Sequence, residues 1–448
     1  MSELKQRARD AIIQSLSAGV VPRIGLEHIQ VGRKNEVDAI LSDLNRIQNE
    51  GVAIRFIIGR YGSGKSFFLN LCRIVALKQK FVVAQADISL ERRLYSSDNH
   101  ARALYTELVH NFAVRAKPEG GALKGLIERW ISDLDQRLKK EGRSNEEILQ
   151  QIPQELKCLQ DFVSGYDFAT VLGKYFEGYQ KSDDQLMSSA IRWLSGEYST
   201  KTEARQDLGV RTIIEDDNIY DYLKLWGRFV KMAGYSGLLV NLDELGVLSH
   251  RLNNVQARNS NYETILHIVN DCLQGSVSGI GFIFAGTDEC LKDQRRGLVS
   301  YRALARRLAV RDDFNVAGLK DFSGPVIELD NLSKEDTYVL LCNIRNVFAY
   351  DDPAKYLIPD KGIEGFLQHC QETLGAEFFR TPGDIVKSYV RMLSILEQNP
   401  GTSWEVLLSN TAVQKSQDIP EDCEKPEEKI PEKPVEPKPT DDLVSFKL

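Results

Sequence analysis

The chain has 448 residues, of which 42% are hydrophobic, and a formal net charge of −7. This length and hydrophobic content allow two or three domains with buried cores. The acidic balance argues against a protein that coats nucleic acid by charge alone, although it leaves room for a local basic face. No apolar run approaches the roughly 18 residues of a membrane span.

The location predicted from the sequence is the cytoplasm. The N-terminal segment MSELKQRARD is charged and lacks the apolar core of a secretory signal. The seven cysteines form no C-x-x-C pair and leave one without a partner, which is typical of reduced thiols in a cytosol. The six histidines are scattered, so a metal site built from His and Cys is not expected.

The hydrophobic pattern predicts an α/β protein. Helical periodicity indicates helices over residues 4–17 and 34–48, with an extended Gly- and Pro-rich segment between them. Short apolar runs predict buried strands at residues 54–58, 81–86, 236–245, 279–287 and 325–332. Because helical segments separate these strands, we expect a parallel sheet covered by helices on both faces.

The stretch between the second and third strands, residues 100–235, is charged and mostly helical in pattern, so we expect a long helical insertion. Breaks in the helical pattern are predicted at residues 118–121, 142–145 and 201–211. Core-like spacing predicts burial of three tryptophans, Trp130, Trp193 and Trp226. An insertion of this length favours a surface for a partner or DNA, and the alternative is a solvated set of helical hairpins.

The last part of the chain divides into helices and a tail. The pattern is helical from residue 333 to about 410, and Ser333 with Asp336 suits a capping box at its start. Residues 413–448 are rich in Pro, Glu and Lys, and we expect them to be disordered because they cannot bury enough surface to fold. The final eight residues, DDLVSFKL, are hydrophobic again, so they either dock as a short peptide on another subunit or protein, or fray.

The segment GRYGSGKS, residues 59–66, matches the pattern G-x-x-x-x-G-K-[ST] between a predicted strand and a predicted helix. Glycines let successive backbone N–H groups form a nest for phosphate oxygens, and the helix N-terminus adds positive potential. Lys65 would reach the β- and γ-phosphates, and the Ser66 hydroxyl would bind Mg²⁺. The alternative is a chance glycine turn. The predicted nucleotide contacts in this loop are Gly59, Arg60, Tyr61, Gly62, Ser63, Gly64, Lys65, Ser66 and Phe67.

An acidic pair, Asp243 and Glu244, follows the third predicted strand. An aspartate at this place in a phosphate-loop protein helps to hold Mg²⁺, and the adjacent glutamate can polarise a water for attack on the γ-phosphate. Such a pair alone is commonly just solvated, but together with the phosphate loop it favours hydrolysis. The segment NLDE is not an N-K-x-D guanine reader, so ATP with Mg²⁺ is the expected ligand.

With these motifs the chain resembles the AAA+ ATPases, especially the branch of origin-recognition and helicase-loader proteins. The resemblance implies a three-layer phosphate-loop domain followed by a helical lid over residues 333–412. It implies that Thr287, after the fourth strand, is the sensor-1 residue near the γ-phosphate. It also implies that VGRKNE places Val31, Gly32 and Arg33 beside the adenine.

The resemblance also implies an arginine supplied in trans by a neighbouring subunit. In RALARRLAVR, Arg306 or Arg307 occupies the place of such a finger, and Arg302 shares a helix face with Arg306. The alternatives are a basic solvated helix or a nucleic-acid contact. At the sensor-2 position, where relatives tend to carry arginine, this chain has Gly383, so Arg380 is the candidate substitute.

Between about residues 10 and 395 the chain resembles more closely the BrxD-like ATPases of the bacteriophage-exclusion (BREX) systems. The segments that carry this resemblance are GVVPRIGLEHIQVGR, IRFIIGRYGSGKSFF, LGVRTIIEDDNIYDYLKLW, AGYSGLLVNLDEL, AGTDE, LVSYRALARRL and FFRTPGDIVKSYV. It implies a role in phage defence beside a helicase, methyltransferase or phosphatase-like protein.

The expected organisation follows from these points. We expect an N-terminal helix and base-binding linker in residues 1–50 and an ATPase core with its insertion in residues 51–332, followed by the lid and the tail. The leading hypothesis is a Mg²⁺-dependent ATPase switch that assembles or remodels a DNA-processing partner. The alternatives are a nucleotide-dependent scaffold or sensor with little hydrolysis, and a DNA-binding ATPase like a helicase loader. Only about ten residues separate the last lid helix from the tail, which leaves no room for a winged-helix DNA reader.

Overall fold

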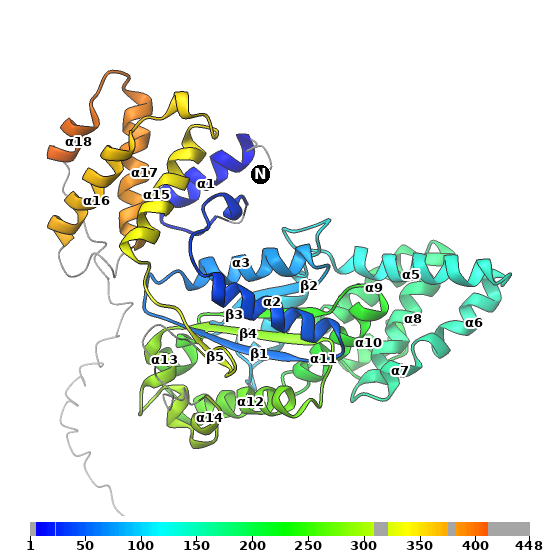
Figure 1. Cartoon of the computed structure of the whole chain (residues 1–448). Helices are drawn as coiled ribbons and strands as arrows, with labels where there is room; N and C mark the ends of the chain where they lie inside the picture. The colour runs from blue at the N-terminus through cyan, green and yellow to red at the C-terminus, as the bar shows by residue number, and fades with distance from the viewer. Residues whose placement is uncertain (1–5, 23, 309–320, 375–381, 411–448) are drawn as a thin grey trace, which may run out of the picture. The chain divides into compact units, whose positions relative to one another are not determined.

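A computed structural model describes residues 6–22, 24–308, 321–374 and 382–410, and a single five-stranded parallel sheet organises this part of the chain (Figure 1). The strand order is β2-β3-β4-β1-β5. The strands are β1 (Ala53–Ile58), β2 (Val82–Asp87), β3 (Leu238–Asp243), β4 (Ile280–Gly286) and β5 (Val326–Glu328). All five predicted strands are therefore confirmed, and β1, β3 and β4 are buried along their whole length, as their continuous apolar runs require.

Helices cover both faces of the sheet. One face packs against α2 (Lys34–Gln48) and α3 (Lys65–Lys78), and the apolar side chains of both helices enter one core with Ile57, Leu239 and Ile283. The other face packs against α11 (Ile219–Met232) and α12 (Val255–Gln274), in a second core that contains Phe56, Val240 and Phe284. Alternate strand residues enter opposite cores, so the layers are helix, sheet and helix.

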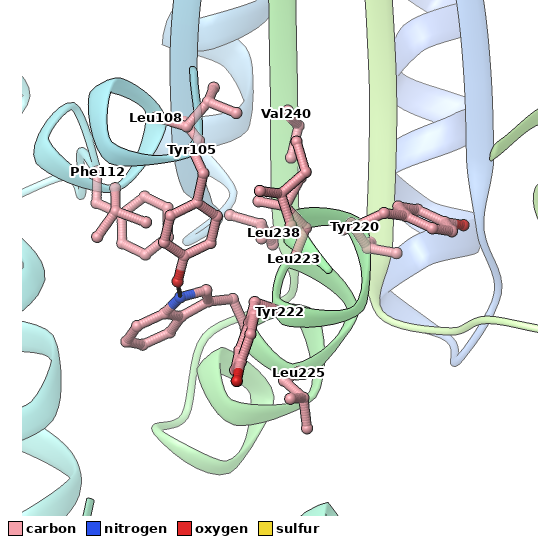
Figure 2. Packing of buried hydrophobic residues seen from close by; sticks show 14 of the residues in the cluster. Tyr105, Leu108, Phe112, Tyr220, Tyr222, Leu223, Leu225, Leu238 and Val240 are labelled. Atoms are coloured by element: carbon pink, nitrogen blue, oxygen red, sulfur yellow. Dashed lines mark hydrogen bonds between the residues drawn. The ribbon is translucent and has the colours of Figure 1, made fainter. Parts of the chain in front are cut away.

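The stretch between β2 and β3 is helical, as predicted. Besides α11, its helices are α4 (His100–His110), α5 (Leu123–Lys140), α6 (Asn145–Glu155), α7 (Lys157–Gln160), α8 (Gly165–Lys181), α9 (Asp184–Leu194) and α10 (Lys201–Leu208). Trp130, Trp193 and Trp226 are buried, which confirms their predicted core position. Figure 2 shows where this core meets β3: the buried indole N–H of Trp226 donates a 2.7 Å hydrogen bond to the Tyr105 hydroxyl.

One prediction in this stretch is wrong. Residues 201–208 form the helix α10, whereas the charged sequence predicted a break over residues 201–211. The Thr200 hydroxyl caps this helix by accepting a hydrogen bond from the Glu203 N–H, and Gly209 ends it in the left-handed conformation. Burial of Ala204 and Leu208 then holds the helix in place, which local periodicity could not indicate.

The helices after β5 pack with the first helix of the chain (Figure 1). The group consists of α15 (Lys334–Phe348), α16 (Asp360–Leu374), α17 (Pro382–Gln398), α18 (Trp404–Asn410) and α1 (Gln6–Ala18), and we call it the helix cluster. Ile12 of α1 is buried against this core. The predicted capping box is confirmed, since the side chains of Ser333 and Asp336 each accept a hydrogen bond from the other's backbone N–H.

Three further short helices are η1 (Leu26–His28), which contacts α3 and α15, α13 (Asp288–Lys292), and α14 (Arg302–Leu308), which contacts α12. A π-helix, η2 (Val247–Arg251), follows β3, and the short 3-10 helices η3 (Leu298–Ser300) and η4 (Pro353–Lys355) complete the described elements. Within the described residues, no helix combines the length and the apolar character needed to cross a membrane.

Candidate nucleotide-binding site

The glycine loop joins the end of β1 to the start of α3. Gly62 and Gly64 have φ values of 77° and 87°, in the left-handed region that glycine adopts without strain. Gly59 is required for a different reason: a Cβ there would lie 2.5 Å from the Ser63 Oγ and 3.0 Å from a backbone oxygen. By contrast, a Cβ on Gly64 would meet no atom within 4 Å, so there is open space beside the loop at this residue.

Lys65, the first residue of α3, turns back over the loop. Its Nζ donates hydrogen bonds to the carbonyl oxygens of Gly59, at 2.9 Å, and Arg60, at 2.8 Å. Burial lowers the pKa of the Lys65 ammonium, while the negative charges of Asp243 and Glu244 act in the opposite direction. The loop therefore holds a half-buried cation at its mouth, which is the arrangement that a polyphosphate requires.

The predicted metal ligands lie together. The Ser66 hydroxyl donates a 2.8 Å hydrogen bond to Asp243 Oδ2, and the Glu244 N–H donates a 2.8 Å hydrogen bond to Asp243 Oδ1. Burial raises the pKa of Asp243, and nearby Asp87 raises it further, whereas these hydrogen bonds and Lys65 lower it. Asp87 ends β2 directly beside Asp243 in the register. It is a carboxylate of the site that the sequence analysis missed, although its place at the end of a strand was a usable signal.

Glu244 and Thr287 follow neighbouring parallel strands, β3 and β4, so they emerge at the same edge of the sheet as the loop. Glu244 is exposed and adopts φ 60°, a left-handed conformation that is uncommon for a residue with a side chain. Thr287 is half-buried, and its Oγ1 lies 4.0 Å from the position of a Cβ on Gly246. Thr287 therefore lies beside the turn that follows the acidic pair.

The remaining loop residues differ in their surroundings. Tyr61 is 81% exposed, and Arg60 is exposed with its Nε 3.9 Å from Asp288 Oδ2. Ser63 is buried, and its hydroxyl has no hydrogen-bond partner in the described part of the chain. Phe67 points away from the loop and packs against the helix cluster.

The VGR segment lies against the loop from outside. Val31 is half-buried, and Gly32, with φ 64°, faces Asp336. Arg33 donates from its guanidinium to the Ser63 carbonyl at 3.1 Å and to the Asp330 carbonyl. The sequence predicts Arg33 beside a base, and these main-chain contacts leave no pattern in the sequence.

The candidate arginines of α14 differ sharply. Arg307 is held in its own subunit, because its guanidinium donates to Asn270 on α12 and, at 2.9 Å, to the Ala303 carbonyl. Arg306 is exposed, and it makes no hydrogen bond or ion pair with the residues that the structure describes. Arg380 lies outside the described residues, so its predicted role stays a prediction.

The chemistry of these residues fits ATP with Mg²⁺. The loop has open space beside Gly64, and the paired oxygens of Ser66 and Asp243 are the ligand type that Mg²⁺ prefers. The described ranges contain no group of three or more His, Cys, Asp or Glu residues that could hold a metal ion. The described cysteines are free thiols.

A parallel sheet with the phosphate loop after β1 and an acidic pair after β3, with β4 between these strands, defines a P-loop nucleotide-binding protein. A family model described as "BREX system ATP-binding protein BrxC/D" matches residues 4–412. The chain therefore belongs to this family of ATP-binding proteins of the BREX phage-defence system. A comparison with curated proteins gave no match.

Proposed function

We propose that this protein hydrolyses ATP and uses the nucleotide state to control a DNA-processing partner in phage defence. The observation that carries the proposal is the meeting of Ser66 and Asp243, at 2.8 Å, beside a phosphate loop and directly before Glu244. Two segments far apart in the chain converge here on groups that phosphoryl transfer needs. A protein that only binds nucleotide has no need of a carboxylate at position 244.

Each residue has a distinct task in this proposal. Lys65 neutralises the β- and γ-phosphates, Ser66 and Asp243 hold Mg²⁺, and the bound ion supplies further neutralisation of charge. Glu244 accepts a proton from the attacking water, and Thr287 orients that water or the γ-phosphate. Val31 and Gly32 lie beside the adenine base.

We further propose that Arg306 of one subunit completes the ATP site of its neighbour. Its free, exposed guanidinium supports this role, because an arginine that acts in trans must not be bound within its own subunit. Arg307 is the weaker candidate, since its guanidinium already donates hydrogen bonds to residues of α12 and α14.

Residues 333–410 would act as a lid whose angle follows the nucleotide, with Arg380 as its contact to ATP. Residues 100–235 would be an insertion that presents a surface to the partner. Membership of the BREX family supports a partner from the same defence system, such as a helicase, methyltransferase or phosphatase-like protein. The protein would act in the cytoplasm.

The test is ATP turnover by the purified full-length protein, measured by phosphate release with and without Mg²⁺. We expect turnover that depends on Mg²⁺ and is lost in Glu244→Gln, while that variant still binds ATP. If wild-type protein binds ATP but Glu244→Gln turns it over at the same rate, the assignment of Glu244 is wrong. If wild-type protein does not bind ATP, the whole proposal fails.

A further inference from the structure

Arg33 occupies an unusual position just before α2. Its backbone is left-handed, with φ 61°, and its side chain is only 12% exposed. Burial lowers the pKa of the guanidinium, although the carboxylates of Glu36, Asp330 and Asp336 act against this effect. A buried guanidinium is costly unless its donors are satisfied, so the contacts it makes here need an explanation.

Two of these contacts are to main-chain carbonyls of separate segments. One Nη group donates to the Ser63 carbonyl inside the phosphate loop and to the Asp330 carbonyl after β5, while the other lies 3.8 Å from Glu36 Oε1. Ser63 itself stands between the two left-handed glycines, Gly62 and Gly64. Arg33 therefore binds the phosphate loop at Ser63, the residue between its two left-handed glycines.

The contact at Ser63 fixes the orientation of one peptide unit of the phosphate loop. The Ser63 carbonyl and the Gly64 N–H belong to one peptide unit, and a trans peptide points these two groups in opposite directions. Because Arg33 holds the carbonyl, the Gly64 N–H points away from Arg33, which would leave it available to a phosphate oxygen. Such pre-orientation removes part of the ordering cost that phosphate binding would otherwise carry.

The contact at Asp330 reaches the helix cluster. Two connections join this cluster to the sheet, because α1 packs with α15 and α17: the segment after α1 leads from the cluster to α2, and the segment after β5 leads from the sheet to α15. Arg33 belongs to the first connection and bonds to the second at Asp330, three residues before the Ser333 cap of α15. One guanidinium therefore joins both connections to the phosphate loop.

We propose that Arg33 is a positioning residue that makes the phosphate loop and the two connections to the helix cluster move as one unit. This inference rests on the proposed ATP site. Phosphates that order the loop would tighten the Ser63 contact and, through the same planar group, the Asp330 contact. A lysine has a single ammonium and cannot reproduce this geometry, so Arg33→Lys keeps the charge but loses the link.

The experiment compares wild type with Arg33→Lys and with the matched control Arg345→Lys. Arg345 is also a buried arginine on a main-chain carbonyl, that of Ile358, and pairs with Asp360 at 2.7 Å inside the helix cluster. Two readouts are needed: the affinity for a non-hydrolysable ATP analogue with Mg²⁺, and deuterium uptake of peptides covering residues 24–33 and 329–333 with and without the analogue.

We expect the analogue to protect both peptides in wild type. In Arg33→Lys we expect a loss of affinity of about tenfold or more, which corresponds to roughly 1.4 kcal/mol, and a loss of at least half of the protection at residues 329–333. Arg345→Lys should lower thermal stability without changing either readout.

Affinity within twofold of wild type and full protection in Arg33→Lys would overturn the inference and leave the ATP site standing. The wild-type data test the inference even if the variant does not fold, because analogue binding without protection of either peptide also overturns it. Absence of analogue binding to wild type would instead reject the ATP site itself.

Discussion

The phosphate-loop edge of the sheet and the aromatic core beside β3 are built on opposite principles. At the edge, Lys65 and Asp243 are charged groups that burial disfavours, and Glu244 adopts an uncommon backbone conformation. In the core, Tyr105 and Trp226 are fully buried, and the Tyr105 hydroxyl accepts a hydrogen bond from the indole N–H (Figure 2). The same hydroxyl donates to the Leu194 carbonyl at 2.9 Å.

The difference separates residues kept for chemistry from residues kept for stability. Functional sites commonly hold strain and desolvated charge that the rest of the fold must support. We therefore expect substitutions at the edge to damage ATP binding or turnover while sparing or even raising stability. Substitutions in the aromatic core should do the reverse.

The largest expected effect is that of Lys65→Ala. Removal of the ammonium leaves the phosphate charge without its main partner in the loop, which should weaken ATP binding by about 100-fold or more. Isothermal titration with MgATP measures this loss, and phosphate release should be undetectable. If Lys65→Ala bound MgATP as tightly as wild type, Lys65 would have no role in ATP binding, and the contrast between the sheet edge and the aromatic core would lose its main support.

Glu244→Gln should separate binding from chemistry. A glutamine keeps the size of the side chain but cannot accept a proton, so turnover should fall by roughly 1,000-fold, the middle of the range for general-base catalysis. Affinity for MgATP should stay within a few-fold of wild type. A variant that loses affinity and turnover in equal measure would indicate that Glu244 binds rather than catalyses.

Arg306→Ala tests whether the ATP site at this edge of the sheet is complete within one subunit. Turnover should fall by about 100-fold, below the usual range for an arginine finger because the guanidinium is exposed, and mixing with Lys65→Ala protein should restore part of the activity. Arg307→Ala is the matched control, and it should mainly affect stability because it loses the contact with Asn270. Full activity of Arg306→Ala in a strictly monomeric protein would refute supply in trans.

In the aromatic core, Tyr105→Phe should cost stability alone. The indole N–H of Trp226 and the Leu194 carbonyl both lose their partner inside the protein, which should lower the free energy of unfolding by about 1–3 kcal/mol. The rise in melting temperature caused by MgATP should be unchanged. A reduced rise would show that this core communicates with the ATP site, against the proposed separation.

The smallest effect is expected for Asp243→Asn without nucleotide. Burial raises the folded-state pKa of Asp243 above its ordinary value of 3.8, so at neutral pH its charged form costs stability. Asn should therefore stabilise the free protein by about 0.5–2 kcal/mol while weakening Mg²⁺-dependent binding.

The pH dependence has a definite sign. The folded protein binds the proton of Asp243 more tightly than the unfolded chain, so this contribution to stability falls as pH rises through the window above 3.8. The advantage of Asp243→Asn over wild type should accordingly grow as the pH rises above about 3.8, as followed by thermal melting. An advantage that shrinks with rising pH would mean that hydrogen bonding, not burial, governs this carboxylate.

Much of the sheet and site could be predicted because their signals are local. The phosphate loop is a contiguous motif, and the strands are short apolar runs whose burial follows from composition. Contacts between residues far apart in the chain could not be predicted from the sequence. Asp87 joins Asp243 only through strand pairing, and the packing of α1 against α17 joins segments more than 300 residues apart. Arg33 met the loop through a carbonyl, which leaves no mark in the sequence.

The most direct test of the central claim is an experimental structure of the protein with Mg²⁺ and a non-hydrolysable ATP analogue. The account predicts triphosphate in the open space at Gly64, Lys65 Nζ on the β- and γ-phosphates, and Mg²⁺ bound by Ser66 beside Asp243. An analogue bound elsewhere, or no analogue in the loop at a saturating concentration, would contradict it.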